Sequence, residues 1–315
     1  MGLLGETKPV KKPILGVSLY PEQESIEEIE NYLTMASRYG FTKIFTSMFS
    51  VPGTKEEVFD YFKNFCDLAH KHGMKVSGDC NTAFFKKMGA SESDISIFKE
   101  MGIDIIRMDL PYFDQRDVTL INNPYNITIE LSSCMIQAVR MALENGANPK
   151  NFSTCHNFYP ERYTASDLES ICSVNKELAN LGIPSAVFIS SNEDNTHGPW
   201  PVHDGLPTVE DHRWIPAELQ VRHWIAVGDV DEIIFGNAFA SEEEFKAIDR
   251  VMNQAYVNIP KLVGEDYLAE LLPHGDVERV PFKVILDDGV TDLEKEILFD
   301  NMLSLIHISE PTRPY

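Results

Sequence analysis

Paired cysteines and long apolar runs are missing from this sequence. Its five cysteines, at positions 66, 80, 134, 155 and 172, are scattered and form no C-x-x-C pair, which disfavours both a disulfide framework and a thiolate zinc site. The N-terminal stretch MGLLGETKPVKKP has no apolar run long enough for a signal peptide or a membrane span. The sequence therefore predicts a protein of the reducing cytoplasm with no membrane partner.

Positive charge is also in short supply. Lys and Arg number 27 against 49 for Asp and Glu, which gives a formal net charge of −22. Because a phosphate backbone binds to a basic surface, this balance argues against nucleic acid as a partner. A small anion remains compatible with it, since a local cluster of Arg, Lys or His is enough to bind one.

Several catalytic motifs are missing as well. No G-x-G-x-x-G opens the first predicted helix, so a dinucleotide fold is disfavoured. No HExxH occurs, and His70 and His72 form an H-x-H only at a predicted helix end, where the helix dipole favours cations. No lysine stands at the carboxyl end of a predicted strand, which disfavours an imine-forming aldolase. We expect neither a metal ion nor an organic cofactor.

What the chain does contain is a recurring unit of a helix pattern, a glycine and an apolar strand. The glycines stand where a helix needs a left-handed residue to end it, at Gly40, Gly73, Gly102, Gly146, Gly182 and Gly228. Predicted helix starts have capping boxes, formed by Ser25 with Glu28, Thr54 with Glu57, Thr164 with Asp167, and Ser241 with Glu244.

Eight predicted strands alternate with these helices. They cover residues 14–20, 43–48, 75–80, 104–110, 127–132, 152–157, 184–189 and 232–237. Eight successive βα units predict an α/β fold, a (β/α)8 TIM barrel over residues 14–257 that follows an N-terminal extension at 1–13. A doubly wound open sheet is the alternative, but it usually has fewer strands.

The pattern changes after the predicted barrel. The stretch RVPFKVILDDG predicts the first strand of a small β-rich domain, so we interpret residues 258–302 as the start of a truncated C-terminal domain. The final segment, LSLIHISEPTRPY at 303–315, reads like a translated sequencing adapter. We interpret it as an artefact and exclude it from the fold.

The polar faces of the predicted strands supply the candidate catalytic residues. Side chains alternate between the two faces of a strand, so Asp79, Arg107, Asp109 and Glu130 should point into the barrel mouth while apolar neighbours meet the helices. Buried charges must be paired, solvated or used. We expect at least one catalytic carboxyl among Asp109 and Glu130, with Asp79 as the next candidate. The structural alternative is an ion pair of Arg107 with Asp109 or Glu130 that only holds the barrel together.

Two loops at the same predicted end of the barrel carry mixed aromatic and charged residues. The stretch CHNFYPERYT, residues 155–164, leaves the sixth strand, and a long loop with SSNEDNTHGPW follows the seventh. Rings stack on sugar faces, and two carboxyls can divide acid and base or nucleophile roles, so the mixture suits a sugar site. An ordinary structural loop and a surface flap are the alternatives.

The motifs GVSLYPE, FTSMF, RMDLPYF, HNFYPERYT, THGPW, GLPTVEDHR and IIFGNAFAS, in this order, resemble the MupG family of phosphosugar glycosidases. The resemblance runs from residue 14 to about residue 300. It implies a TIM barrel followed by a small cyclophilin-like domain. It also implies hydrolysis of 6-phospho-N-acetylmuramyl-N-acetylglucosamine inside bacteria that recycle their cell wall.

A small anionic sugar substrate needs local positive charge, for which Arg107, Arg162, His197 and Arg213 are the candidates. Barrel phosphates often lie at the loops after strands 7 and 8. Because the helix after strand 8 opens with Glu242, Glu243 and Glu244, we expect phosphate at backbone amides near Gly236 instead, with His197 or Arg213. The expected substrate contacts are Tyr20, Arg107, His156, Asn157, Tyr159, Arg162, His197, Trp200, Arg213, Gly236 and Asn237.

Two functions fit these observations. The first is a glycosidase that acts on a phosphorylated amino-sugar disaccharide without a cofactor. The second is a carbohydrate-binding barrel without catalysis. The sequence leaves the oligomeric state and the choice between retention and inversion open.

Overall fold

The structure is a computed structural model that describes residues 12–20, 23–48, 51–200 and 204–254. The chain divides into two units, Lys11–Asn253 and the remaining residues at both ends. The first unit contains the barrel. The predictions for most of the extension at 1–13, for the C-terminal domain at 258–302 and for the adapter-like segment at 303–315 lie outside the described residues.

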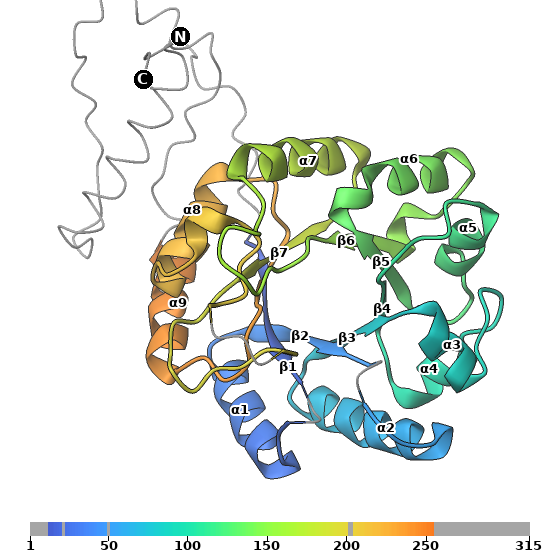
Figure 1. Cartoon of the computed structure of the whole chain (residues 1–315), viewed down its shortest axis with the longest axis horizontal. Helices are drawn as coiled ribbons and strands as arrows, with labels where there is room; N and C mark the ends of the chain where they lie inside the picture. The colour runs from blue at the N-terminus through green and yellow to red at the C-terminus, as the bar shows by residue number, and fades with distance from the viewer. Residues whose placement is uncertain (1–11, 21–22, 49–50, 201–203, 255–315) are drawn as a thin grey trace, which may run out of the picture. The chain divides into compact units, whose positions relative to one another are not determined.

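Eight parallel strands close into a barrel in sequence order, with β8 paired to β1 (Figure 1). This confirms the predicted (β/α)8 barrel and rules out the open sheet. The strands are β1 Ile14–Leu19, β2 Phe41–Ser47, β3 Lys75–Cys80, β4 Ile105–Met108, β5 Thr128–Ser132, β6 Phe152–Cys155, β7 Ser185–Ile189 and β8 Glu232–Phe235.

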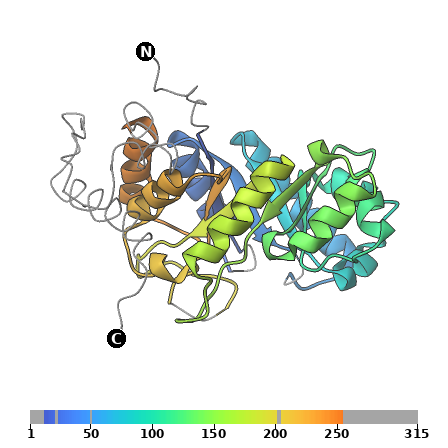
Figure 2. The same ribbon diagram turned by 90° about the horizontal axis from the view of Figure 1, so that it is seen from above.

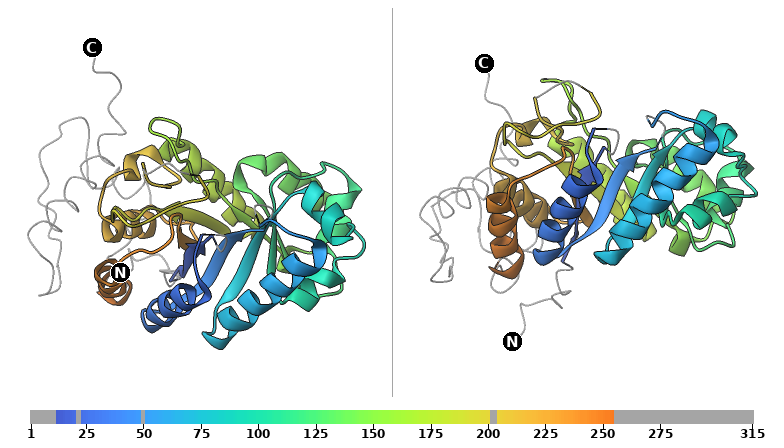
Figure 3. Two further views of the ribbon diagram at one scale, coloured as in Figure 1. Left: turned by 60° about the horizontal axis from the view of Figure 1, so that its bottom comes forward. Right: turned by 90° about the horizontal axis from the view of Figure 1, so that it is seen from below.

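Helices surround the barrel. Figure 2 shows α7, in yellow-green, along the outside of the strands, and Figure 3 shows α1 and α2, in two shades of blue, on the outside of the first strands. The α-helices are α1 Ile26–Arg38, α2 Lys55–Lys71, α3 Thr82–Met88, α4 Ser96–Met101, α5 Gln115–Ile121, α6 Ile136–Glu144, α7 Leu168–Leu181, α8 Ala217–Val227 and α9 Glu242–Gln254. Short 3-10 helices are η1 Ser133–Met135, η2 Pro149–Asn151 and η3 Glu210–His212. In the described part of the chain, no helix is long and apolar enough to cross a bilayer.

Local sequence signals explain where most helices begin and end. All six predicted glycine stops have a positive φ, between 72° and 92°, a conformation that costs glycine little. The capping boxes that open α1, α2 and α9 are present.

The predicted capping box of Thr164 with Asp167 is wrong. Helix α7 begins at Leu168, and its cap is Asp167, whose side chain accepts a hydrogen bond from the Ser170 amide. The hydroxyl of Thr164 instead donates to the Glu161 carbonyl at 2.5 Å. The loop before α7 is therefore longer than the sequence indicated.

Polar side chains fill part of the barrel interior, as predicted. The Lys43 ammonium of β2 lies 2.8 Å from Glu130 of β5 and 2.5 Å from Glu232 of β8. Because β2 and β5 are not neighbours in the sheet, their contact has to cross the inside of the barrel. An aromatic layer, in which Phe45 meets Phe188 edge to face, fills another part of the interior.

Candidate active site

A guanidinium at the carboxyl end of β4 joins groups from two other strands. Arg107 donates from one terminal nitrogen to Oδ1 of Asp79 at 2.7 Å and from the other to Oδ1 of Asn157 at 2.5 Å. Asp79 belongs to β3, and Asn157 follows β6. The guanidinium also lies 6.0 Å from the centroid of the Phe45 ring. The structure therefore brings three predicted site residues into one hydrogen-bonded cluster at the barrel mouth.

The carboxyl of Asp79 is the most perturbed acid of this cluster. Burial raises its pKa, the Arg107 guanidinium lowers it, and the charges of Asp109 and Glu130 raise it, so that the pKa lies above its ordinary value. Its side chain keeps 13% of its surface exposed, and the hydrogen bond from Arg107 occupies only Oδ1. A carboxyl of this kind can hold a proton at a higher pH than an ordinary aspartate and can release it to a bound ligand.

Asp109 lies just past the end of β4 and is exposed. Its backbone amide donates to the Cys80 carbonyl at 2.9 Å, which fixes the start of the loop beside the end of β3. The ion pair that the sequence suggested between Arg107 and Asp109 does not form, because Arg107 pairs with Asp79. Asp79 and Asp109 thus give the mouth a buried and an exposed carboxyl, near enough for their charges to interact.

The prediction that Glu130 joins the carboxyls at the mouth is wrong. Its side chain is fully buried and is bound by Lys43, by Ser77 at 3.2 Å and by Ser153 at 3.4 Å. Ser77 precedes Asp79 by two residues on β3, so Glu130 lies a layer deeper. Strands in a barrel tilt against its axis, so a row of paired residues descends from one strand to the next. The register Asp79–Arg107–Glu130 follows such a row.

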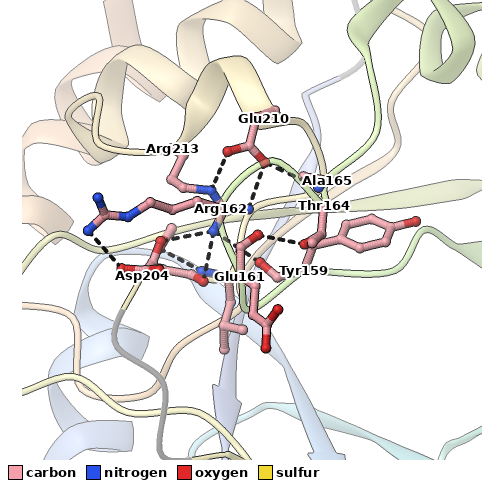
Figure 4. Close-up of polar contacts among 11 residues, drawn as sticks. Tyr159, Glu161, Arg162, Thr164, Ala165, Asp204, Glu210 and Arg213 are labelled. Carbon is pink, nitrogen blue, oxygen red and sulfur yellow. Dashed lines mark hydrogen bonds and ion pairs between the residues drawn. The ribbon is translucent and has the colours of Figure 1, made fainter.

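The loop after β6 is bound to the loop after β7 through Arg213 (Figure 4). The Arg213 guanidinium forms a two-point ion pair with Glu210, at 2.7 and 2.9 Å. It also donates to the backbone carbonyls of Tyr159, Asp204 and Gly205. The hydrogen bonds that Arg213 donates to Glu210 lower the pKa of the Glu210 carboxyl to about 2.

In the described part of the chain the partners of Arg213 are thus Glu210 and three backbone carbonyls, and the Arg213 side chain is almost fully buried. The expectation that it binds a substrate anion is not supported by this geometry. Its contacts instead fix the positions of the two loops.

Arg162 has a different environment. It makes one ion pair, with Asp204 at 3.1 Å, and keeps 58% of its side-chain surface exposed. Its guanidinium lies 5.2 Å from the centroid of the Trp214 ring. It can therefore meet a ligand without losing a buried contact. Nearby, the hydroxyl of Tyr159 accepts a hydrogen bond from Ser166 at 3.3 Å.

Three other predicted contacts are turned inward. His156 is buried and hydrogen-bonded to Asn175 at 2.8 Å, and burial lowers its pKa to about 4. The Tyr20 hydroxyl donates to the Gly236 carbonyl at 2.6 Å. The Gly236 amide donates to the Ile189 carbonyl at 2.7 Å, so this amide is already used within the sheet. The Gly236 amide is therefore not open to phosphate, while phosphate at neighbouring backbone amides stays a prediction.

A small pocket of about 120 Å³ lies between the loops after β7 and β8. Its lining includes Glu193, Asp194, His197, Trp214 and Asn237. The ring of His197 is 2.5 Å from a Glu24 oxygen, and the Asn237 amide holds the loop at Ser191 and Thr196.

Among the described residues, those that line this pocket include two exposed carboxylates and neither arginine nor lysine. Two like charges repel an anion. The usual phosphate position of a barrel is therefore unfavourable for phosphate in this chain.

Exposed aromatic residues stand around the mouth. Trp214 and Tyr163, with φ of 73° and 65°, adopt a left-handed backbone that a bulky residue rarely takes, and Tyr163 is 90% exposed. The predicted contact Trp200 is half exposed and meets the ring of Phe158 at 6.0 Å. Trp214 was not among the predicted contacts, although it directly follows Arg213 in the same loop.

The described residues thus form a barrel with carboxyl, guanidinium, amide and aromatic groups at the carboxyl ends of its strands. This is the end at which (β/α)8 barrel enzymes carry their sites. Residues 15–250 match the family model of the 6-phospho-N-acetylmuramidase N-terminal domain. The chain belongs to this family, which confirms the resemblance in its sequence.

Two solved structures are similar to the chain. An uncharacterized protein of B. cereus is 36% identical, with a TM-score of 0.67 over 76% of this chain and 65% of that one. A conserved Enterococcus faecalis protein of unknown function is 22% identical, with a TM-score of 0.66 over the same shares, and supports the fold alone. The chain thus spans about two thirds of the length of these relatives. No curated protein matches it.

Proposed function

We propose that the chain is the barrel part of a glycosidase that hydrolyses 6-phospho-N-acetylmuramyl-N-acetylglucosamine. The family match over residues 15–250 carries this proposal. The buried Asp79 and the exposed Asp109 at the mouth support it, because most glycosidases use two carboxyls in different environments.

In the proposed mechanism Asp79 is the general acid. Its raised pKa favours the protonated form that gives a proton to the leaving oxygen. Asp109 is exposed. As a base it takes a proton from the water that attacks the anomeric carbon; as a nucleophile it attacks that carbon itself, and water then hydrolyses the bond between sugar and enzyme. Both roles are carboxyl chemistry, so the proposal involves no metal ion or organic cofactor.

The anion of the substrate is proposed to meet Arg162 at the rim of the mouth. Arg162 is the candidate cation with an open side chain, whereas Arg107 and Arg213 are held by protein groups. The exposed ring of Trp214 lies against Arg162 and can stack on a sugar face there, and the half-exposed ring of Trp200 offers a second such face. Following the family resemblance, we propose a role in cell-wall sugar recycling in the bacterial cytoplasm, which cell fractionation can test.

The decisive assay incubates the purified protein with MurNAc-GlcNAc, phosphorylated or unphosphorylated at C6, and identifies the products by mass. We expect cleavage of the phosphorylated disaccharide. Binding of this disaccharide without any product would favour the second candidate, a sugar-binding barrel.

We predict that Asp109→Asn and Asp79→Asn each lower kcat by roughly a hundredfold or more, because each removes an ionisable group while keeping the shape of the side chain. Glu130→Gln is the comparison variant. Glu130 lies in the buried ion pair with Lys43, so its loss should lower the melting temperature rather than act on the chemical step. Folded Asp109 and Asp79 variants with kcat within a few-fold of the parent would refute the assignment.

A further inference from the structure

The side-chain amide of Asn157 has a fixed orientation. A guanidinium can only donate hydrogen bonds, so the atom of Asn157 that faces Arg107 has to be its oxygen. The Ser132 hydroxyl reaches the same oxygen at 3.4 Å. No hydrogen bond within the described part of the chain involves Nδ2 of Asn157, and the residue is only half-buried. The amide group therefore presents its two N–H donors away from Arg107.

The same guanidinium orients Asp79. Its other terminal nitrogen binds Oδ1 of that carboxyl, which leaves Oδ2 for a ligand. A planar guanidinium holds two partners in a fixed relative geometry, which a lysine ammonium cannot do. Arg107 thus presents one carboxyl oxygen and one amide donor side by side, close enough for one sugar ring to contact both.

We propose that Asn157 donates a hydrogen bond to an uncharged oxygen, a hydroxyl or an acetamido carbonyl, of the sugar that Asp79 protonates. In this proposal Arg107 is the residue that positions both groups. The inference rests on the proposed function and makes it more specific. It assigns Arg107 to the organisation of the site rather than to the substrate phosphate.

The charge around Asn157 favours an uncharged acceptor. Both terminal nitrogens of Arg107 are already bound, one to Asp79 and the other to Oδ1 of Asn157, and the exposed carboxylate of Asp109 lies at the same mouth. A phosphate at Nδ2 would face the negative charge of Asp109, while the guanidinium stays turned to its two protein partners. A hydroxyl or an amide carbonyl avoids this repulsion and still accepts a hydrogen bond from Nδ2.

The test variant is Asn157→Asp. It keeps an oxygen for Arg107 and nearly the same shape, but it replaces the two donors with a second acceptor. The new carboxylate also adds a negative charge beside Arg107, which raises the pKa of Asp79 and displaces the limb of the pH profile that Asp79 sets. If Asn157 only held Arg107, that displacement would be the whole effect. We expect kcat/KM for the phosphorylated disaccharide to fall at least tenfold on the plateau of the pH profile as well.

Asn122→Asp is the matched control, because Asn122 also accepts a hydrogen bond through Oδ1, from the Asn148 amide, at the end of α5. It should leave the kinetic constants unchanged. Arg107→Lys keeps the charge but loses the two-point geometry. It should lower kcat/KM at least as much as Asn157→Asp and should also displace the limb of the pH profile that Asp79 sets.

Two kinetic outcomes would overturn the inference: a kcat/KM of Asn157→Asp within threefold of the parent, or a loss that only follows a displaced pH limb. Calorimetry with the same disaccharide separates this result from the proposed function. If the parent binds without cleaving, the proposed reaction fails, and a tenfold weaker Kd of Asn157→Asp still supports the donor role. If the parent does not bind the disaccharide at all, both proposals fall.

Discussion

At the scale of single residues, burial separates side chains that look equivalent in the sequence. Arg162 and Arg213 are both arginines in mouth loops rich in aromatic residues. One is mostly exposed with a single ion pair, and the other is almost fully buried with a two-point ion pair and three backbone carbonyls. Only the second has a clear structural role in the described residues.

We predict opposite effects for the two alanine variants. Arg213→Ala should cost about 2–3 kcal/mol of unfolding free energy, because it leaves three carbonyls and Glu210 without their donor. Arg162→Ala should stay within about 1 kcal/mol of the parent, as exposed ion pairs do. If Arg162 meets the substrate anion, its variant should instead raise KM roughly tenfold or more.

Chemical denaturation and steady-state kinetics measure these two quantities. A KM of Arg162→Ala within twofold of the parent, on a folded variant, would remove Arg162 from the site. An Arg213→Ala variant as stable as the parent would show that the two loops hold together without its contacts.

Two buried histidines predict acid sensitivity. Burial lowers the pKa of His212 to about 3, with a further contribution from His223, and it lowers the pKa of His156 to about 4. In the unfolded chain both titrate near pH 6.5. Below pH 6.5 each histidine binds a proton in the unfolded state but stays neutral in the folded state. The stabilisation present above pH 6.5 is therefore lost as the pH falls towards 4 for His156 and towards 3 for His212.

Within this window each histidine should contribute a slope of about 1.4 kcal/mol per pH unit to the free energy of unfolding. Denaturation curves at several pH values between 7 and 4 measure it. Carboxylates titrate in part of the same range, so the comparison is between the parent and His156→Gln. The variant should lose stability at pH 7 and show a shallower slope. An unchanged slope would mean that His156 is protonated in the folded state.

At the scale of elements, the loops after β6 and β7 behave as one unit. The Tyr159 amide donates to the Pro207 carbonyl at 3.2 Å, and the Ser166 amide donates to Thr208 at 3.2 Å. Together with Arg213, these bonds hold Arg162 and Trp214 against each other. A sugar would meet this surface with little loop ordering to complete, which lowers the entropic cost of binding.

The start of α7 gives a prediction at the same scale. Asp167→Ala removes the side chain that caps this helix and should cost about 1 kcal/mol. Thr164→Ala removes a hydroxyl bonded to a carbonyl inside the preceding loop and should cost less. Thermal denaturation of both variants ranks them. A larger loss for Thr164→Ala would mean that the helix begins where the sequence first indicated.

At the scale of the whole molecule, the sequence was a good guide to the fold because each βα unit carries its own signals. Gly102 and Gly182 stop their helices, and the apolar strands that follow pair in chain order. The alternation of side chains between the two faces of β3 and β4 was also enough to predict that Asp79 and Arg107 point to the same side of the sheet.

What the sequence did not reveal depends on contacts between distant units. The pair of Thr164 and Asp167 fits a capping box locally, yet Asp167 with Ser170 fits the start of a helix equally well. The burial of Glu130 depends on Lys43, which is 87 residues away, and on the tilt of the strands. The structural role of Arg213 depends on three backbone carbonyls from two loops. A local sequence pattern does not encode contacts between residues that lie this far apart in the chain.

The final prediction concerns the net charge of −22. A phosphorylated muramic sugar is itself anionic, and the mouth carries the exposed carboxylates of Asp109, Glu193 and Asp194. Charges separated by more than about 10 Å are screened at ~0.1 M salt, and less so in dilute buffer. Raising the salt from roughly 20 to 200 mM should therefore lower KM for the phosphorylated disaccharide while kcat stays constant.

Arg162 provides the matched test of this effect. Arg162→Ala removes the exposed attraction that we propose for the anion, which salt would also screen, so KM should fall more steeply with salt than in the parent. Initial rates at constant pH across the salt series measure both slopes. A KM that rises with salt in the parent, and rises less in Arg162→Ala, would mean that local attraction at the rim outweighs the charge of the molecule as a whole.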